Sequence, residues 1–395
     1  MSDATYDVVV IGGGIAGASV AAQLAGELHV CVLERESQPG YHATGRSAAI
    51  FSEIYGNAPI RALSRASRSF FFNPPGDFSD VALIGKRGSL YIARTNQLDR
   101  LDAFAAMPGV AEATRRLSGR ESRMLSPLLR KDYVRAALYE PAASDLDVHA
   151  LLQGYLRMLR VNGGMLVTEG EVLGLERTND KWHVHTSTRG YSAPIVINAA
   201  GAWVDQIAEL AGAASIGIQP LRRTAAIVDA PSGFHISGWP LTIDIDEQFY
   251  FKPDAGRLLL SPAEETPSPA CDASPEDWDV AVAVDRVEAA TNLKIEHVRQ
   301  KWAGLRSFVD DRSPVVGYDS ALPGFFWVAA LGGYGIQTAP AMGRLAAAMI
   351  LQHPLPEDLL ATGFEPASTA PQRLHAQKTA ARQATLAHSS PTSSV

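Results

Sequence analysis

The sequence predicts an α/β fold in which a Rossmann-like domain is interleaved with an α+β domain built on an antiparallel sheet. A β-rich run at residues 6–11 leads through a glycine-rich turn to a helical pattern over residues 15–24, and a second β-rich run follows at residues 28–33. A strand–helix–strand unit this short pairs its strands in parallel. Residues 82–93 and 225–260 instead alternate strand-like runs with turn residues, which is typical of antiparallel sheets. Two architectures in one chain indicate two domains.

Composition limits the function classes. The chain has 395 residues, of which 46% are apolar and 19% charged, which excludes global disorder and a coiled coil. Its 35 Lys and Arg residues against 42 Asp and Glu residues give a net charge of −7, so we expect no nucleic-acid partner. Cys31 and Cys271 are the only cysteines, too few for a disulfide framework, and they favour a reducing, cytoplasmic location.

Two apolar stretches have the length of a membrane span. Residues 8–26 carry no charge, but they follow Asp3 and Asp7 and contain three consecutive glycines that suit a tight turn. Residues 321–342 are interrupted by Pro323 and several glycines. We therefore expect no transmembrane segment.

The motif Gly12-x-Gly14-x-x-Gly17 lies between the first strand and the helix, where a dinucleotide fingerprint belongs. Gly12 permits the tight turn, Gly14 lets a pyrophosphate approach the backbone, and Gly17 lets helix and strand pack closely. The helix N-terminus, at Ile15 and Ala16, presents free N–H groups to the phosphates.

Glu34 ends the second strand, where a carboxylate accepts hydrogen bonds from the ribose hydroxyls and repels a 2′-phosphate. The alternative is a glycine-rich turn without a ligand, but strand, glycines, helix and acid are all in place. These residues alone are compatible with either NAD or FAD.

Residues 39–49, PGYHATGRSAA, follow this acid closely. Here the chain resembles the D-amino-acid oxidase superfamily of FAD enzymes, and within it the bacterial D-arginine dehydrogenases. The resemblance is nearly gapless over residues 6–364, and the segments that also carry it are residues 68–75, 196–203, 302–308 and 332–338.

The resemblance implies that FAD is the cofactor. Its further contacts are expected at Arg35, Thr44, Gly45, Arg46, Ser47, Ala48, Val172, Gly332, Gly335, Ile336 and Gln337. We expect the FAD to be bound noncovalently: Cys31 lies within a strand, Cys271 lies in a Pro/Ser-rich loop far from the flavin segments, and the similar enzymes carry His42 with a dissociable flavin. Residues 332–337 are expected as a loop before a helix that starts at Ala339.

The resemblance also assigns a substrate site. Arg223 and Arg306 match arginines that bind the substrate carboxylate, for which the planar guanidinium is suited. Tyr250 matches a tyrosine that helps to hold the same carboxylate, Tyr55 one that closes over the substrate, and Gly333 a backbone carbonyl that meets the amine. Spacing alone leaves open whether Arg222 or Arg223 faces the site, and whether Arg306 instead forms a structural ion pair with Asp310 or Asp311.

Two positions depart from the arginine-specific pattern. Ser89 stands where those enzymes have a glutamate, and Ile50 where they have a histidine. Glu53 is a nearby acid without a counterpart there, and it could substitute only if its side chain turns inward. Because burying a cationic side chain without a carboxylate partner is costly, we expect a neutral or apolar substrate side chain rather than arginine.

The sequence therefore predicts FAD-dependent oxidative deamination of D-amino acids, with hydride transfer from Cα to flavin N5 and release of a 2-oxo acid and ammonia. The alternatives are oxidation of secondary amino acids, such as N-methyl or cyclic imino acids, and a non-catalytic flavin-binding subunit. The identity of the electron acceptor stays open. Asp145, Asp147 and His149 are too few to hold a metal, so we expect none.

The domain limits follow from these segments. We expect a discontinuous FAD-binding domain at residues 1–80, 145–215 and 316–365, and a substrate-binding domain at residues 81–144 and 216–315. Residues 366–395, rich in Ala, Ser and Thr, are expected to form a flexible tail.

Overall fold

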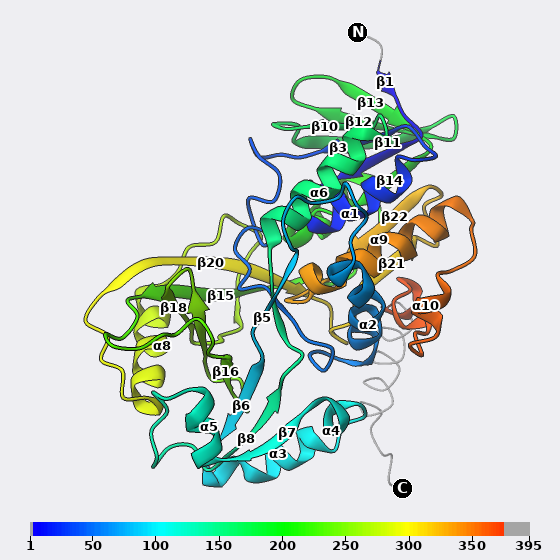
Figure 1. Ribbon diagram of the computed structural model, residues 1–395. Coiled ribbons are helices and arrows are strands. Elements are labelled where there is room, and N and C mark those ends of the chain that lie inside the picture. Colours follow the sequence, from blue (N-terminus) through cyan, green and yellow to red (C-terminus); the bar gives the residue numbers. More distant parts are fainter. Residues whose placement is uncertain (1–2, 375–395) are drawn as a thin grey trace, which may run out of the picture.

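A computed structural model describes residues 3–374 of the chain (Figure 1). Its first large element is a six-stranded sheet, drawn in the upper part of Figure 1. Five of its strands run parallel, and β21 pairs antiparallel with β22 at one edge. The strand order is β10 (Met165–Val167), β3 (Val30–Leu33), β2 (Val8–Ile11), β14 (Ile195–Asn198), β22 (Phe325–Ala329) and β21 (Val315–Tyr318).

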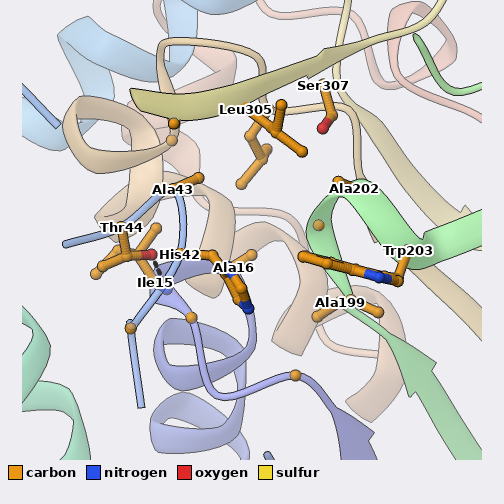
Figure 2. A pocket seen from close by; sticks show the side chains of 18 of the residues that line it. Ile15, Ala16, His42, Ala43, Thr44, Ala199, Ala202, Trp203, Leu305 and Ser307 are labelled. Carbon is orange, nitrogen blue, oxygen red and sulfur yellow. Dashed lines mark hydrogen bonds between the residues drawn. The ribbon is translucent and has the colours of Figure 1, made fainter. Parts of the chain in front are cut away.

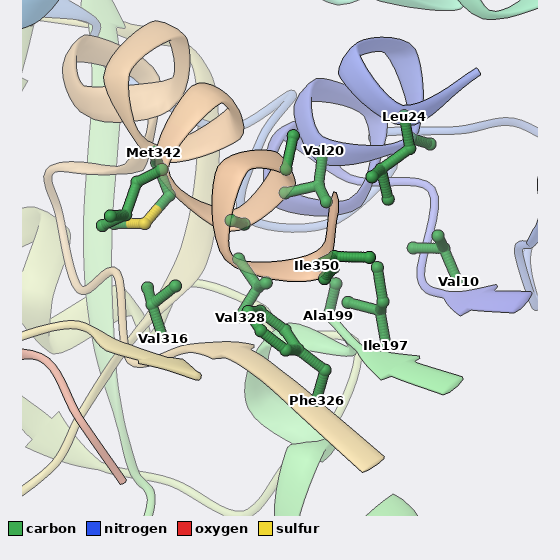
Figure 3. Packing of buried hydrophobic residues seen from close by; sticks show 14 of the residues in the cluster. Val10, Val20, Leu24, Ile197, Ala199, Val316, Phe326, Val328, Met342 and Ile350 are labelled. Atoms are coloured by element: carbon green, nitrogen blue, oxygen red, sulfur yellow. The ribbon is translucent and has the colours of Figure 1, made fainter. Parts of the chain in front are cut away.

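The short strand β2 shows why this sheet is buried on both faces. Val8 and Val10 pack on one face among residues of α1 (Ile15–Leu24) and α9 (Gly335–Leu351), and Figure 3 shows Val10 on the side of Leu24 of α1. The alternate residues Val9 and Ile11 pack on the other face. All four residues are at most 5% exposed, so the continuous apolar run satisfies both layers of a parallel sheet.

Small residues allow α1 and α9 to cross closely over the sheet. A Cβ at Gly343 of α9 would lie 2.9 Å from the backbone oxygen of Ser19 in α1, so only glycine fits this contact. The helix α2 (Ala58–Phe72) packs in the same hydrophobic cluster as α1 and α9. It begins after Asn57, whose side chain accepts a hydrogen bond from the Ile60 N–H. The remaining helices of this part are α6 (Val148–Val161), α7 (Val204–Ala211) and α10 (Glu357–Leu360).

A four-stranded sheet covers the opposite face. Trp182 and Tyr191 from this sheet are buried against Val9 and Ile11 of β2. Its order is β1 (Ala4–Thr5), β13 (Gly190–Ala193), β12 (Lys181–Thr186) and β11 (Val172–Thr178).

The second large element is a nine-stranded sheet, drawn in the lower part of Figure 1. Its pairs are antiparallel except for β16 with β6. The order is β19 (Thr266–Pro267), β15 (Gln219–Val228), β18 (Arg257–Ser261), β17 (Tyr250–Asp254), β16 (Leu241–Asp244), β6 (Ser89–Ala93), β8 (Ala136–Glu140) and β7 (Arg115–Ser118), with β20 (Val298–Phe308) also paired to β15.

The helix α8 (Asp277–Ala290) buries one face of this sheet, with Val287 packed among Phe249, Phe251 and Leu260. The opposite face carries Leu241 and Tyr250. The shorter helices of this part are α3 (Leu98–Ala105), α4 (Val110–Ala113) and α5 (Gly119–Leu125), and the 3₁₀ turns of the chain are η1 (Thr95–Gln97), η2 (Gly201–Trp203) and η3 (Pro366–Ser368).

A small antiparallel sheet links segments from different parts of the chain. It consists of β4 (Ile50–Phe51), β9 (Ser144–Leu146) and β5 (Ile84–Lys86). Through β4 it sets the position of the loop that follows Phe51, which carries Tyr55.

The structure confirms the predicted fold class and the helix at residues 15–24, although β2 begins at Val8 rather than Tyr6. The expected tail differs at its start. Leu374 is 3% exposed and the Arg373 guanidinium pairs with Asp311 at 2.7 Å, so residues 366–374 pack on the protein. The rest of that segment lies outside the described residues. Within residues 3–374, no helix is long and apolar enough to cross a bilayer.

Candidate active site

A cavity lies where the carboxyl ends of the parallel strands face the nine-stranded sheet. Gly12 and Gly14 follow β2, Glu34 follows β3, and the segments that follow β14 and β22 complete this wall. The carboxyl edge of a parallel sheet is where α/β folds bind ligands. Figure 2 shows side chains that converge on the cavity, among them Thr44, Trp203 and Leu305.

The glycine motif has the geometry that its sequence predicts. Gly12 has φ +109°, and a Cβ there would lie 2.5 Å from the backbone oxygen of Ala199. A Cβ at Gly17 would lie 2.0 Å from the backbone oxygen of Gly12, so Gly17 supports the turn without lining the cavity. Gly14 does line the cavity, and its nearest obstacle is the Thr44 hydroxyl at 3.3 Å. The turn therefore leaves room at Gly14 for a phosphate to approach the backbone.

Glu34 lines the cavity with its carboxylate held in place. It accepts hydrogen bonds from the N–H groups of Gly13 and Glu36, both at 2.9 Å, and it is 7% exposed. A carboxylate fixed at the end of β3 suits the ribose hydroxyls of a dinucleotide.

The segment at residues 40–48 forms the next part of the wall. The Thr44 hydroxyl accepts a hydrogen bond from the Ile15 N–H at 3.0 Å and so joins this segment to the start of α1. Ser47 and Ala48 also line the cavity. Gly45 does not: its N–H donates to the backbone oxygen of Gly40 at 2.8 Å, and its part is to close that turn.

Arg46 lines the cavity but directs its guanidinium at a neighbouring loop. It donates to the backbone oxygens of Ala273 at 2.8 Å and Ala303 at 3.0 Å, and it pairs with Asp272. Tyr41 also donates to Asp272, at 3.1 Å. These contacts hold residues 271–273 against the segment at residues 40–48.

The expectation that Cys271 lies far from the flavin segments is therefore wrong, because Cys271 lines the same cavity. It is distant from those segments only in sequence, and Arg46 brings its loop to them. Cys31 is completely buried in β3, and burial raises the pKa of its thiol to about 12, which makes it unreactive.

Sequence reasoning gave Trp203 no role, yet its side chain lines the cavity. The indole ring lies 4.6 Å from the His42 ring, and the Arg35 guanidinium lies 4.8 Å from the indole centroid. The signal was the segment at residues 196–203, which carries the resemblance and runs past the end of β14, because residues at that place face the ligand edge of the sheet. Val172 of β11 completes this end of the cavity.

Residues 332–337 do not form a single loop. The helix α9 begins at Gly335 rather than Ala339, so Gly332 and Gly333 precede it, while Gly335 and Ile336 line the cavity from its first turn. Gln337 is turned away from the cavity. Its Oε1 accepts from the Ser52 N–H at 3.1 Å and its Nε2 donates to the Ser64 hydroxyl at 2.9 Å. The expected flavin contact at Gln337 is replaced by this buried contact.

Arg306 of β20 lines the other half of the cavity and is partly buried. Its Nη1 donates to the Tyr55 hydroxyl at 3.2 Å. A Cβ at position 333 would lie 2.6 Å from its Cζ, so Gly333 lets the guanidinium lie against the backbone. Within residues 3–374, no carboxylate lies within 4.0 Å of this guanidinium, so the expected alternative of an ion pair with Asp310 or Asp311 is not present.

The neighbouring strand β15 places Arg223 on the cavity and Arg222 on its opposite face. Arg222 pairs with Asp279 at 2.9 Å. The Arg223 Nε donates to the backbone oxygen of Glu264 at 2.7 Å, and its Nη2 lies 3.4 Å from Glu265. Burial, together with the charge of Arg306, lowers the pKa of Arg223. Two arginines thus face one site from paired strands.

Of the other expected substrate residues, only Tyr250 lines the main cavity. Tyr250 lines the cavity, whereas the Tyr55 ring packs 4.9 Å from the Tyr334 ring and lines an adjacent cavity. Ile50 packs with Tyr250 in an apolar cluster, and Ser89 is fully buried, with a hydroxyl that has no hydrogen-bond partner among the described residues. Neither lines the main cavity.

The acid Glu53 does not replace the missing glutamate, because it pairs with Arg68 at 2.8 Å. Across residues 3–374, no cluster of three or more His, Cys, Asp or Glu side chains could hold a metal ion.

Comparison with known proteins identifies the family. Residues 7–349 match the family described as DAO, FAD dependent oxidoreductase, and the chain belongs to this family. It is therefore an FAD-dependent oxidoreductase. The cavity fits that cofactor, because the Gly14 backbone, the Glu34 carboxylate and the first turn of α9 would hold its diphosphate, ribose and ring.

The chain is similar over most of its length to curated proteins of low sequence identity. Glycine oxidase of Geobacillus kaustophilus is 24% identical over 87% of this chain and 93% of that protein. Human mitochondrial sarcosine dehydrogenase is 24% identical over 89% of this chain but only 40% of its own length.

Solved structures show the shared fold. The crystal structure of the Geobacillus glycine oxidase has a TM-score of 0.78 with 22% identity, covering 89% of this chain and 96% of that one. L-proline dehydrogenase from P. horikoshii has a TM-score of 0.76 with 22% identity, covering 90% and 96%.

Proposed function

We propose that this protein is an FAD-dependent D-amino-acid dehydrogenase that oxidises substrates with neutral side chains. The observation that carries the proposal is Arg306. It is a guanidinium at the wall of the cavity with no carboxylate partner among the described residues. A cation removed from bulk water needs an anion, and the α-carboxylate of an amino acid supplies one.

The surrounding groups would fix the orientation of that substrate. Arg306 offers a planar pair of donors, and Arg223 and Tyr250 lie on the same cavity. The backbone at Gly333 lies against the Arg306 guanidinium, and the resemblance assigns the Gly333 carbonyl to accept a hydrogen bond from the substrate amine. Bound FAD supplies a hydride acceptor, at flavin N5, for the hydrogen on Cα. The protein residues therefore hold carboxylate and amine so that this hydrogen faces the cofactor.

The side-chain preference follows from the apolar cluster beside Tyr250. This cluster contains Ile50 and Leu241, and Ser89 on the neighbouring strand carries no charge. Glu53 is engaged by Arg68. None of these residues offers a free carboxylate, and the carboxylate of Glu140, opposite Ser89, accepts a hydrogen bond from the Ser52 hydroxyl at 2.8 Å. D-arginine should therefore be a poor substrate despite the resemblance to D-arginine dehydrogenases.

Secondary amino acids are the second candidate substrates, and the comparisons favour them. Proteins similar to this chain include the sarcosine and dimethylglycine dehydrogenases, and the L-proline dehydrogenase shares its fold. The same carboxylate contacts serve either class, since they do not depend on whether the amine is primary or secondary.

The test is anaerobic bleaching of the visible flavin band by a panel of amino acids. Bleaching by neutral D-amino acids, but weakly by D-arginine, would support the proposal. Bleaching only by sarcosine, dimethylglycine or proline would favour the second candidate. If no amino acid reduces the flavin while the protein retains it, the proposed activity is wrong and a flavin-binding subunit without its own activity becomes the better account.

A further inference from the structure

Glu140, at the end of β8, is a buried acid that the proposed reaction does not use. It is 1% exposed, and within residues 3–374 no basic group lies within 4.0 Å of its carboxylate. It pairs in register with Ser89 of β6. Directly opposed residues of an antiparallel pair share one face of the sheet, so Glu140 lies beside the position where the resemblance places a substrate contact.

The hydrogen bonds of Glu140 lead out of its own sheet. Its Oε2 accepts from the Ser52 hydroxyl at 2.8 Å. Ser52 is buried, and its N–H donates to the Gln337 side chain at 3.1 Å. Gln337 lies in the first turn of α9 and donates in turn to Ser64 of α2. The short loop that contains Ser52 is therefore hydrogen-bonded to Glu140 of the nine-stranded sheet and to Gln337 of α9.

The same loop carries Tyr55. It runs from β4 to the start of α2, and Tyr55 lies three residues beyond Ser52. The Tyr55 hydroxyl meets Arg306 at 3.2 Å. The position of Tyr55 against Arg306 thus depends on how firmly Ser52 is held.

We infer that Glu140 is a positioning residue for substrate binding: through Ser52 it holds the loop that places Tyr55 against Arg306. This inference rests on the proposed function, in which Arg306 binds the substrate carboxylate. Glu140 itself touches neither substrate nor cofactor.

The contact is sensitive to ionisation. Burial raises the pKa of Glu140 to about 7, against the opposing effect of hydrogen bonds from Ser52 and the Glu53 backbone. The other groups that act on it are the Glu53 carboxylate from the same loop, Arg61 from α2 and Tyr91 from β6. An ionised carboxylate accepts a stronger hydrogen bond than a protonated one. The loop should therefore be held more firmly above pH 7 than below it.

The test compares Glu140→Gln and Ser52→Ala with Asp244→Asn in the FAD-loaded protein. Asp244 is a fully buried acid of the same large sheet, but its side-chain partner is Gln97 and it does not contact the loop. Benzoate, a carboxylate without an oxidisable amine, is titrated while the flavin absorption band is followed at pH 6 and pH 8. Arg306→Met serves as the reference variant, because it removes the guanidinium that is proposed to bind the carboxylate.

We expect Kd for benzoate at pH 8 to rise about tenfold in Glu140→Gln and Ser52→Ala, and to stay unchanged in Asp244→Asn. At pH 6 the increase for Glu140→Gln should shrink to about threefold or less. For an oxidised amino acid, KM should rise by a similar factor while kcat changes less than threefold. If Glu140→Gln does not retain FAD, Ser52→Ala decides the question.

The outcomes separate the two proposals. Unchanged benzoate binding in both loop variants, with binding lost in Arg306→Met, would overturn the role of Glu140 alone. Weaker benzoate binding in the loop variants, in a protein that no amino acid reduces, would support Glu140 and overturn the proposed reaction. Binding that is lost equally at both pH values would overturn the positioning role and leave a structural one.

Discussion

Arg306 and Arg222 show how the surroundings of a residue decide what its charge can do. Arg222 pairs with Glu276 and Asp279 on the outer face of its strand, so its charge is already compensated. Arg306 faces the cavity, and its side-chain partner is the hydroxyl of Tyr55. A cation in that situation is available to an incoming carboxylate.

We expect Arg306→Met to lower kcat/KM for the preferred amino acid on the order of 100-fold, equivalent to about 3 kcal/mol, because the carboxylate loses a charged partner. The loss should appear mainly in KM. Steady-state kinetics with a dye acceptor measures it, and Arg222→Met is the matched control, with unchanged kinetics. An unchanged KM in Arg306→Met would remove the carboxylate role.

Ser89 tests the side-chain preference. Ser89→Glu should raise the ratio of kcat/KM for D-arginine over D-leucine about tenfold or more, because a carboxylate then faces the guanidinium. Ser89→Gln has the same length without the charge and should leave the ratio near that of the parent protein. Since Ser89 lies opposite the acid Glu140, the glutamate variant should also unfold at a lower temperature. A ratio that stays constant would place the side-chain pocket elsewhere.

At the scale of elements, the start of α1 depends on one glycine that does not line the cavity. A Cβ at Gly17 would lie 2.0 Å from the Gly12 backbone oxygen, so any side chain displaces the turn that faces the phosphates. Gly26, just beyond the same helix, has no atom within 4 Å of the corresponding position.

Gly17→Ala should therefore lose most of its bound flavin, whereas Gly26→Ala should retain it. The ratio of flavin to protein absorbance after gel filtration measures both. Full flavin content in Gly17→Ala would show that the turn tolerates the displacement and would contradict the close-packing role of this glycine.

Elements that are specified by neighbouring residues could be predicted from the sequence, whereas the positions of residues held by long-range contacts could not. The glycine turn, Glu34 and α1 are specified within about 25 consecutive residues, and the structure places them as expected. Cys271 and Gln337 were misplaced because long-range contacts decide where they lie, with Arg46 holding one loop and Ser52 the other. Local pattern carries no information about such contacts. The assignment of Ser89 and Ile50 to the substrate pocket stays a prediction.

In the molecule as a whole, polar contacts join the two large sheets that bound the cavity. Arg46 ties the cofactor side to residues 273 and 303, and Ser52 ties the nine-stranded sheet at Glu140 to α9. The domain limits predicted from sequence stay a prediction. Because Arg46 lines the cavity and Ser52 lies on the loop that carries Tyr55, we expect the strength of substrate binding and the stability of the whole fold to depend on the same contacts.

The pH dependence of global stability tests this link. The pKa of Glu140 rises from 4.5 to about 7 in the folded protein, so the folded state binds its proton more tightly than the unfolded state. The stability that this proton provides is fully present below pH 4.5 and is lost as the pH rises to 7. The free energy of unfolding, measured relative to Glu140→Gln, should therefore fall by about 3 kcal/mol over this range, at roughly 1.4 kcal/mol per pH unit.

Urea unfolding at several pH values between 4.5 and 8, with FAD in excess, gives the measurement. Glu121→Gln is the control, because Glu121 is exposed and hydrogen bonds from Ser118 lower its pKa, so its difference from the parent protein should stay constant over this range. A constant difference for Glu140→Gln as well would mean that Glu140 ionises as it does in water. The loop at Ser52 would then be held equally at every pH, and the fold and the binding site would not share this titration.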